Sequence, residues 1–307
     1  MTDSSQTRLA YTAESTWGAT PSTPTWTNVR FTGESLVANI QNTQSQEIRP
    51  DRNVADLAQV GADSGGSVDV ELSYGGYMDD WIEAALGGTW ATNVLKNGAT
   101  FRSFTLEKTF EQGATDQFHR YEGSVIDTMS LSLAPGSIAT GSFGFVGKNG
   151  VSAQAEVASS TYTAVNSNPV MNAASDFASL AITGATGPEL TALDINVANN
   201  LRTQPVIGVL GARGVGLGQF SVSGSATAYF ENAELYELFL DGTEADLSFK
   251  IGGASDLNYT FDIPRLKFQT AQVNAGGNNQ DVLVNLTFQG LFDSGESAAL
   301  KVTRVPS

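Results

Sequence analysis

Residues 64–88 read SGGSVDVELSYGGYMDDWIEAALGG, and this stretch contains both kinds of local structure expected in the chain. Its first part, SVDVELSY, alternates polar and apolar residues, which is the two-residue period of a strand with one buried face. After the glycine pair, the apolar residues of MDDWIEAAL recur at helical spacing. The stretch therefore predicts a strand followed by a short helix over about residues 78–86, which ends at Gly87 and Gly88.

The composition favours a mainly β protein. The chain has 307 residues, of which 41% are hydrophobic and 16% charged, so it can bury a substantial core. It contains 32 glycines, only 9 prolines and many Ser, Thr and Asn residues, a mixture typical of many short strands joined by turns. The absence of cysteine excludes disulfides and thiolate chemistry.

The charge argues against a protein that grips nucleic acid. The formal net charge is -16, whereas phosphate binding needs clustered Lys and Arg to release counterions. A negative wall would instead repel DNA and let it pass without sticking.

The opening stretch has a counterpart 154 residues later. Residues 218–242 read GQFSVSGSATAYFENAELYELFLDG, and the alternation runs in the same phase. A second short helix is expected over about residues 232–240. We infer a tandem duplication into two β domains, residues 1–155 with an N-terminal arm and residues 156–307. An Ala/Ser/Asn-rich linker or surface excursion is expected over about residues 148–180.

The adjacent carboxylates Asp79 and Asp80 allow two interpretations. Two acids can divide acid and base roles when their environments separate their pKa values. Carboxylates in the first helical turn can instead bind free N–H groups and complement the helix dipole. The aligned positions in the second half are Ala233 and Glu234, so the pair does not recur. We therefore predict that Asp79, Asp80 and, in the second half, Asn232 are helix N-terminal caps.

The sequence predicts no enzyme, no cofactor and no metal site. His119 is the single histidine, and no nucleophile signature accompanies it. The glycine run GARGVGLG at 211–218 lacks the GxxxxGK[ST] pattern of a phosphate-binding loop, and a flexible loop is the preferred interpretation. The N-terminal residues lack a secretion signal, which favours a protein made in the cytoplasm. An outer-membrane or secreted β protein, porin-like or adhesin-like, remains the alternative.

The stretch QEIRPDRNVADLAQVGADSGGSVDVELSYGGYMDDWIEAALGG, together with the later TYTAVNSNPV, resembles the tail tube proteins (major tail proteins) of long-tailed bacteriophages. The resemblance implies two tandem tail-tube-like β-sandwich or barrel domains, each with one short flanking α-helix. It implies a virion structural protein of the phage tail, with the tape measure, tail terminator and distal tail proteins as partners. Related tubes are usually hexameric rings, so a duplicated chain predicts a trimeric ring with pseudo-sixfold symmetry. The stacked rings would form a hollow tube for DNA ejection.

Two sets of site residues follow as hypotheses. The polar positions of the two alternating strands are expected to face the channel: Asp69, Glu71, Ser73, Ser223, Ser225 and Thr227. The long loops at 48–63 and 203–218 resemble connections that stack one ring on the next, with the charged residues Arg49, Asp51, Arg52, Asp56 and Arg213 in position for inter-ring ion pairs.

Overall fold

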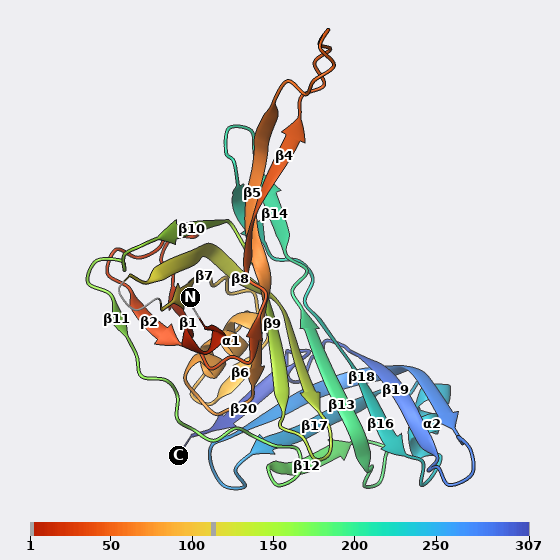
Figure 1. The fold of residues 1–307 in the computed structure, drawn as a ribbon. Helices are drawn as coiled ribbons and strands as arrows, with labels where there is room; N and C mark the ends of the chain where they lie inside the picture. Colours follow the sequence, from red (N-terminus) through yellow and green to blue (C-terminus); the bar gives the residue numbers. More distant parts are fainter. Residues whose placement is uncertain (1–2, 112–114, 307) are drawn as a thin grey trace.

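The computed structural model describes residues 3–111 and 115–306 and consists mainly of β-strands with two short α-helices (Figure 1). In chain order the elements are η1 (Ser4–Gln6), β1 (Thr7–Ala13), β2 (Thr25–Asn28), β3 (Gly33–Glu34), β4 (Val37–Gln44), β5 (Leu57–Glu71), α1 (Tyr77–Leu86), β6 (Val94–Lys96), β7 (Phe104–Phe110), β8 (Gln117–Leu133), β9 (Thr140–Gly147), β10 (Asn149–Ala153), β11 (Thr161–Tyr162), β12 (Phe177–Ile182), β13 (Leu190–Ala198), β14 (Arg202–Pro205), β15 (Ala212–Gly216), β16 (Ser221–Tyr229), α2 (Glu234–Leu240), β17 (Ala245–Gly252), β18 (Asn258–Asn274), β19 (Leu283–Gly290) and β20 (Lys301–Val305). The prediction of a mainly β chain with two short helices is confirmed.

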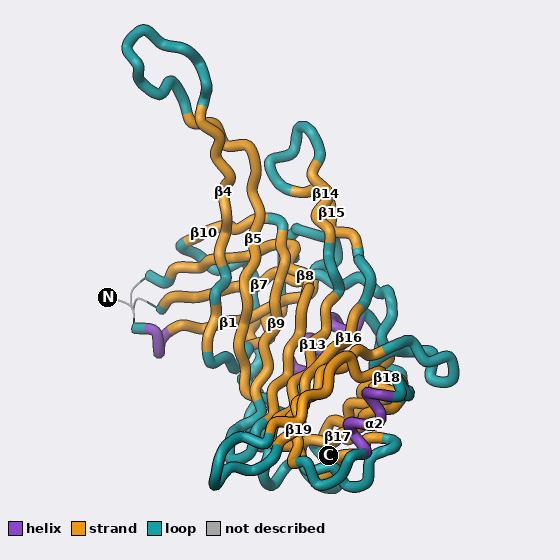
Figure 2. Tube along the Cα trace, turned by 90° about the vertical axis from the view of Figure 1, so that its right-hand side faces the viewer, coloured by secondary structure: helices purple, strands orange, loops and turns teal. Residues whose placement is uncertain are grey.

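One continuous antiparallel sheet runs through both halves of the chain (Figure 2). Its strand order is β4, β5, β9, β8, β13, β16, β19, β18. The halves are joined where β8 pairs with β13, from Leu133 opposite Leu193 to Thr128 opposite Ala198. In the part of the chain that the structure describes, the strands do not close into a barrel. The pairing of β8 with β13 places strands of both halves in one sheet. The expected division into two β domains stays a prediction.

Strand β8 belongs to two layers. Its first part, up to Ser124, pairs with β7 and β10, whereas its second part, from Val125, pairs with β9 and β13. The change of direction falls at Gly123, whose φ of 69° is open to glycine but strained for other residues. A Cβ at this glycine would also lie 3.0 Å from Nε1 of Trp17. Strands β1, β2, β7 and β10 thus form a second layer that continues from the main sheet (Figure 1).

The same strand order occurs twice. The order β1, β7, β8, β9, β5, β4 in the first half matches β12, β17, β18, β19, β16, β13 in the second. A register shift also recurs at the same place, between Ile126 and Thr128 in the β8–β9 ladder and between Phe268 and Thr270 in the β18–β19 ladder. A bulge bends a strand and increases its twist, so the two halves bend alike.

A glycine opposite a phenylalanine marks corresponding positions in the two halves. Gly66 of β5 pairs with Phe145, and Gly224 of β16 pairs with Phe288. A Cβ on Gly224 would lie 2.4 Å from the ring of Phe288, so this position requires glycine. The two glycines are 158 residues apart. The strand pairing therefore matches the two halves with a shift of 158 residues, four more than the shift of 154 in the sequence alignment. Because four is an even number, both alignments place each side chain on the same face of the sheet.

Helix α1 lies in the centre of the core, with seven buried residues. The ring of Trp81 is fully buried and lies 5.2–5.6 Å from the rings of Tyr11, Tyr77, Phe143 and Phe145. Aromatic pairs at such distances add to the free energy of burial. Helix α2 is shorter and buries only two residues, Leu235 and Leu238.

The predicted caps of α1 are wrong. The N-cap residue is Gly76, and no side chain caps the helix, because the helix begins two residues earlier than Asp79. Asp79 instead accepts hydrogen bonds from the hydroxyl of Tyr259 (2.6 Å) and from Nη1 of Arg304 (2.6 Å). Asp80 accepts a hydrogen bond from the hydroxyl of Tyr11 (2.5 Å). Burial raises the pKa of both tyrosines, which keeps their hydroxyls protonated as donors.

The start of α2 differs from that of α1. Ala233 is the N-cap, and Asn232 lies one residue before it. The side-chain oxygen of Asn232 accepts a hydrogen bond from the backbone N–H of Glu234 (3.0 Å). Asn232 therefore binds a free N–H group of the first turn, although from one position further out than a cap.

The segment 148–180 runs along the first half of the molecule and contains β10, β11 and the start of β12. Tyr162 stacks on Trp26 with their ring centroids 6.3 Å apart. The side chain of Asn166 donates a hydrogen bond to the backbone oxygen of Tyr74 (2.8 Å). These contacts hold the segment against the strands it passes.

Candidate functional site

The polar face of the continuous sheet extends across strands of both halves of the chain. Residues directly opposite each other on neighbouring strands share a face, so the pairing register defines rows across the sheet. One row consists of Asp69, Ser142, Ser130, Asn196, Ser223 and Gln289. The next consists of Glu71, Thr140, Ser132, Asp194, Ser225 and Thr287. Every side chain in these two rows is polar.

The opposite face of the same strands forms the core. Val70, Leu131 and Ile195, from three strands, are each almost completely buried there. Burial of such side chains contributes about 1.5–3 kcal/mol each. Because the apolar face is covered, the polar face must meet water or another molecule.

Three carboxylates lie on this polar face, Asp69, Glu71 and Asp194. The first row continues to Lys267 of β18, which is opposite Gln289, so the charges in the two rows sum to a net negative value. Asp69 is exposed and accepts a hydrogen bond from the hydroxyl of Ser142 (2.5 Å), and Asp194 accepts one from Ser225 (3.2 Å). Asp194 is not among the channel residues predicted from the sequence. Its signal was present in LDINV, where Asp194 alternates with the apolar Leu193 and Ile195.

The predicted channel residues share this face with one exception. Asp69, Glu71, Ser223, Ser225 and Thr227 lie on it by register. Ser73 does not, because its side chain is fully buried and its backbone forms a β-bridge with Val170. Strand β5 ends at Glu71, so alternation no longer decides which way the following side chains point.

Both outer strands of the continuous sheet have a free edge in the part of the chain that the structure describes. Strand β4 pairs only with β5, and all eight of its residues are exposed. The second part of β18, Leu266–Asn274, pairs only with β19 along Thr270 to Asn274. An unpaired edge offers N–H and C=O groups to another strand.

The first predicted loop is largely an extended hairpin, which we call the arm: β4, the loop 45–56 and the first part of β5 (Figure 1). Residues 57–63 belong to β5, so the predicted loop at 48–63 is too long. Within the tip, Arg49 and Asp51 form an ion pair (3.0 Å), and this guanidinium lowers the pKa of Asp51 to about 2. Arg52 and Asp56 are exposed in the same loop.

The second predicted loop, 203–218, also contains a hairpin, formed by β14 and β15. The glycine run at 211–218 is therefore partly a strand, since glycine weakens strand propensity without forbidding pairing. Arg213 is exposed on this hairpin. The backbone oxygen of Leu210 accepts a hydrogen bond from the N–H of Ala62 (2.8 Å), so the hairpin leans on the arm.

His119, the single histidine, packs against an aromatic side chain. His119 lies on β8 with its ring 5.1 Å from that of Phe110, edge to face. Among residues 3–111 and 115–306, no group of three His, Asp or Glu side chains is arranged to hold a metal ion.

Comparison with known families gives one decisive match. The family model described as phage tail tube protein matches residues 4–290. The chain belongs to the phage tail tube protein family. A search of curated proteins gave no match.

Membership in this family makes the chain a structural protein of the virion tail and implies self-assembly into a tube, together with association with other tail proteins. No helix among the described residues is long and apolar enough to cross a membrane. The polar face, the two free sheet edges and the two hairpins of this tail tube protein are thus the surfaces on which its assembly has to be explained.

Proposed function

We propose that three copies of this tail tube protein join edge to edge into a ring with pseudo-sixfold symmetry, and that the rings stack into a negatively charged conduit for DNA. The observation that carries the proposal is the repeated strand order in one sheet that has two free edges. Within the chain, β8 of the first half pairs with β13 of the second. The same contact between β18 of one copy and β4 of the next would continue the sheet around a ring.

The internal junction also supplies a register. Ile195 neighbours Gly224 as Leu36 neighbours Gly66, so Leu36 is the counterpart of Ile195. Ile195 pairs with Leu131, which lies three residues beyond the bulge-flanking Thr128. The residue at the same distance beyond Thr270 is Val273. The proposed pairing therefore places Leu36 opposite Val273 and Val37 opposite Gln272 of the neighbouring copy.

Cysteine cross-linking tests this register, because the chain has no native cysteine. Val37→Cys and Gln272→Cys would face each other in the ring, and directly opposite residues of antiparallel strands are close enough for a disulfide. Oxidation of the double variant should give covalent trimers and no larger species on a denaturing gel. The matched control, Val37→Cys with the exposed Tyr229→Cys, should stay monomeric. Symmetry analysis of rods by electron microscopy should show three chains per ring, and six chains or no rods would refute the trimer.

In the proposed ring, the polar face lines the channel, and Asp69, Glu71 and Asp194 keep DNA off the wall by repulsion. Replacing all three with lysine should slow DNA ejection from assembled virions, because the phosphates would then be attracted. Glu237→Lys in α2 with Asp241→Lys at its C-cap, both exposed, is the control and should leave ejection unchanged. An unchanged ejection rate in the triple variant would contradict the conduit role of these residues.

Stacking of the rings is assigned to the arm and the second hairpin, which project from the same end of the molecule (Figure 1). Arg52, Asp56 and Arg213 would be free to form inter-ring ion pairs. Deletion of residues 51–60 should block polymerisation. By family resemblance, the tape measure, tail terminator and distal tail proteins are the further partners. The family match favours this function over an outer-membrane or secreted protein.

A further inference from the structure

The tip of the second hairpin is an exposed apolar knob. Its residues 205–211 read PVIGVLG and carry no charge. The side chain of Ile207 is fully exposed, and Val206, Val209 and Leu210 are each at least 38% exposed. Exposed apolar clusters of this kind mark interaction sites on soluble proteins.

The knob is held in place before it meets any partner. The backbone oxygen of Leu210 is bonded to Ala62 of the arm, and Gly211 lies beside the backbone of Ala62 and Lys148. Gly208 turns the tip with a φ of 90°, which is open to glycine. A preformed tip loses little conformational freedom on binding.

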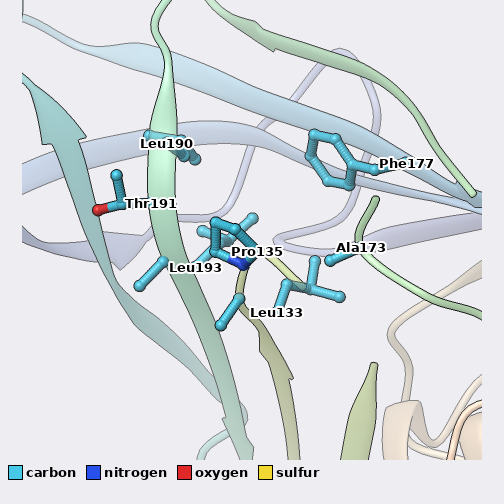
Figure 3. Close-up of a pocket in the computed structure, with 9 residues that line it drawn as sticks. Leu133, Pro135, Ala173, Phe177, Leu190, Thr191 and Leu193 are labelled. Carbon is cyan, nitrogen blue, oxygen red and sulfur yellow. The ribbon is translucent and has the colours of Figure 1, made fainter. Parts of the chain in front are cut away.

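An apolar pocket lies at the start of β13 (Figure 3), at the end of the molecule opposite the second hairpin (Figure 1). It has a volume of about 50 Å³ and is formed where β8 ends, β13 begins and the chain enters β12. No lining residue is charged, and Thr191 is the one hydroxyl among them. The lining residues are Leu133, Ala134, Pro135, Ala173, Phe177, Leu190, Thr191, Ala192 and Leu193.

Strand β13 connects the two features. Its first residues line the pocket, and the chain leaves its last residue toward the second hairpin. A strand of nine residues spans about 30 Å, so one chain cannot place its own knob in its own pocket. A knob and a pocket at opposite ends of one molecule make a heterologous contact, and such contacts generate open-ended stacks.

We propose that Ile207 in the knob of one copy inserts into the pocket of a copy in the adjacent ring. This inference rests on the proposed stacking of rings and names the receiving surface. A neutral pocket fits this uncharged knob better than it fits the tip of the arm, where the charged residues Arg49, Asp51 and Arg52 follow the exposed Ile48 in the sequence. The contact joins rings along the tube axis, whereas the pairing of β18 with β4 joins chains around it.

Two cross-links separate these contacts. Ile207→Cys with Ala173→Cys, treated with a short bismaleimide in assembled tubes, should give a ladder of species that continues beyond the trimer. The lateral pair at Val37 and Gln272 should stop at the trimer, because a ring closes. Each single-cysteine variant is a control. Ladders from the axial pair without trimers from the lateral pair would refute the ring and keep the axial contact. Tubes in which the axial pair gives only monomers would overturn the inference.

A substitution at the knob gives an independent test. Ile207→Asp should raise the protein concentration needed for tube formation by at least about tenfold, because the proposed contact would then have to bury a charge in place of an apolar side chain. Trimer formation, measured by mass photometry, and the melting temperature should match those of the unmodified protein, since Ile207 is solvated in the single chain. Val165→Asp, at another exposed apolar position, is the matched control and should assemble normally. Normal tube formation by Ile207→Asp would contradict the proposal.

Discussion

The two halves of the sheet share one strand order but differ in what covers them. In the first half, α1 is enclosed between the main sheet and the second layer, with Trp81 at the centre of four aromatic rings. In the second half, α2 buries two side chains, and Leu240 at its end is 61% exposed. The difference teaches that halves with the same strand order can enclose their helices to different extents, and that β2 and β10 of the second layer have no counterpart in the repeated order.

The largest expected effect breaks the sealed half. Trp81→Ala should lower the free energy of unfolding by about 3–5 kcal/mol, because a large cavity would remain among rigid rings. Leu238→Ala in α2 should cost about 2 kcal/mol, since its surroundings can relax toward solvent. Urea denaturation followed by circular dichroism measures both. Equal costs would show that the two helices are equally enclosed.

The second comparison concerns one position in two ladders. Glu107 pairs with Arg120 across β7 and β8 as a buried ion pair (2.7 Å), and the corresponding residues of β17 and β18 are Ser248 and Asp262, which share a hydrogen bond. Glu107→Ala should cost about 3–5 kcal/mol, because it leaves the guanidinium buried without its partner.

The control for that substitution is Ser248→Ala, which should cost about 1 kcal/mol, because it removes a partly exposed hydrogen bond. The same denaturation experiment measures it. If Ser248→Ala proved as damaging as Glu107→Ala, the two ladders would be equivalent in energy as well as in register.

A third test concerns the contacts of Asp79 with the second half of the chain. Asp79 on α1 binds Tyr259 of β18 and Arg304 of β20, and Arg304 also lies over the ring of Trp90. Asp79→Asn should cost about 2 kcal/mol, since two hydrogen bonds lose the carboxylate charge. Asp80→Asn, whose carboxylate contacts Tyr11 in the same half, should cost less. Calorimetry that finds no destabilisation in Asp79→Asn would mean that the contacts of Asp79 do not stabilise the junction of the halves.

The smallest effect is expected at the surface of the second half. Glu244 forms an exposed ion pair with Arg265 (2.6 Å), which lowers the pKa of the glutamate. A lowered pKa in the folded state means that any stabilisation is present at neutral pH and is lost as the pH falls below about 4. Glu244→Gln should leave the melting temperature unchanged at neutral pH, because water and salt screen such pairs. A clear drop would show that this edge is less solvated than its exposure indicates.

Local patterns in the sequence predict much of this structure. The alternation at 64–72 predicts strand β5 and the orientation of Asp69 and Glu71, and the spacing in DDWIEAAL predicts α1. These features depend on neighbours within a few residues, and such neighbours are visible in a single sequence.

Features that depend on distant partners could not be predicted. Asp79 looked like a cap because its partners, Tyr259 and Arg304, lie 180 and 225 residues away in the sequence. The junction of β8 with β13 also escaped prediction, because alternation fixes the face of a strand but not its neighbour. The four-residue difference between the two ways of matching the halves has the same origin. Identical residues suggested one alignment, and the paired glycines and phenylalanines give another.

Strand β8 has a mechanical consequence. Its first part belongs to the second layer and its second part to the continuous sheet, with Gly123 as the bend between them. A load on the continuous sheet therefore passes to the second layer through covalent bonds of one continuous backbone. Layers held only by side-chain packing could slide or peel apart under the same load. In this protein, separation of the two layers would first require the hydrogen bonds on both sides of β8 to break.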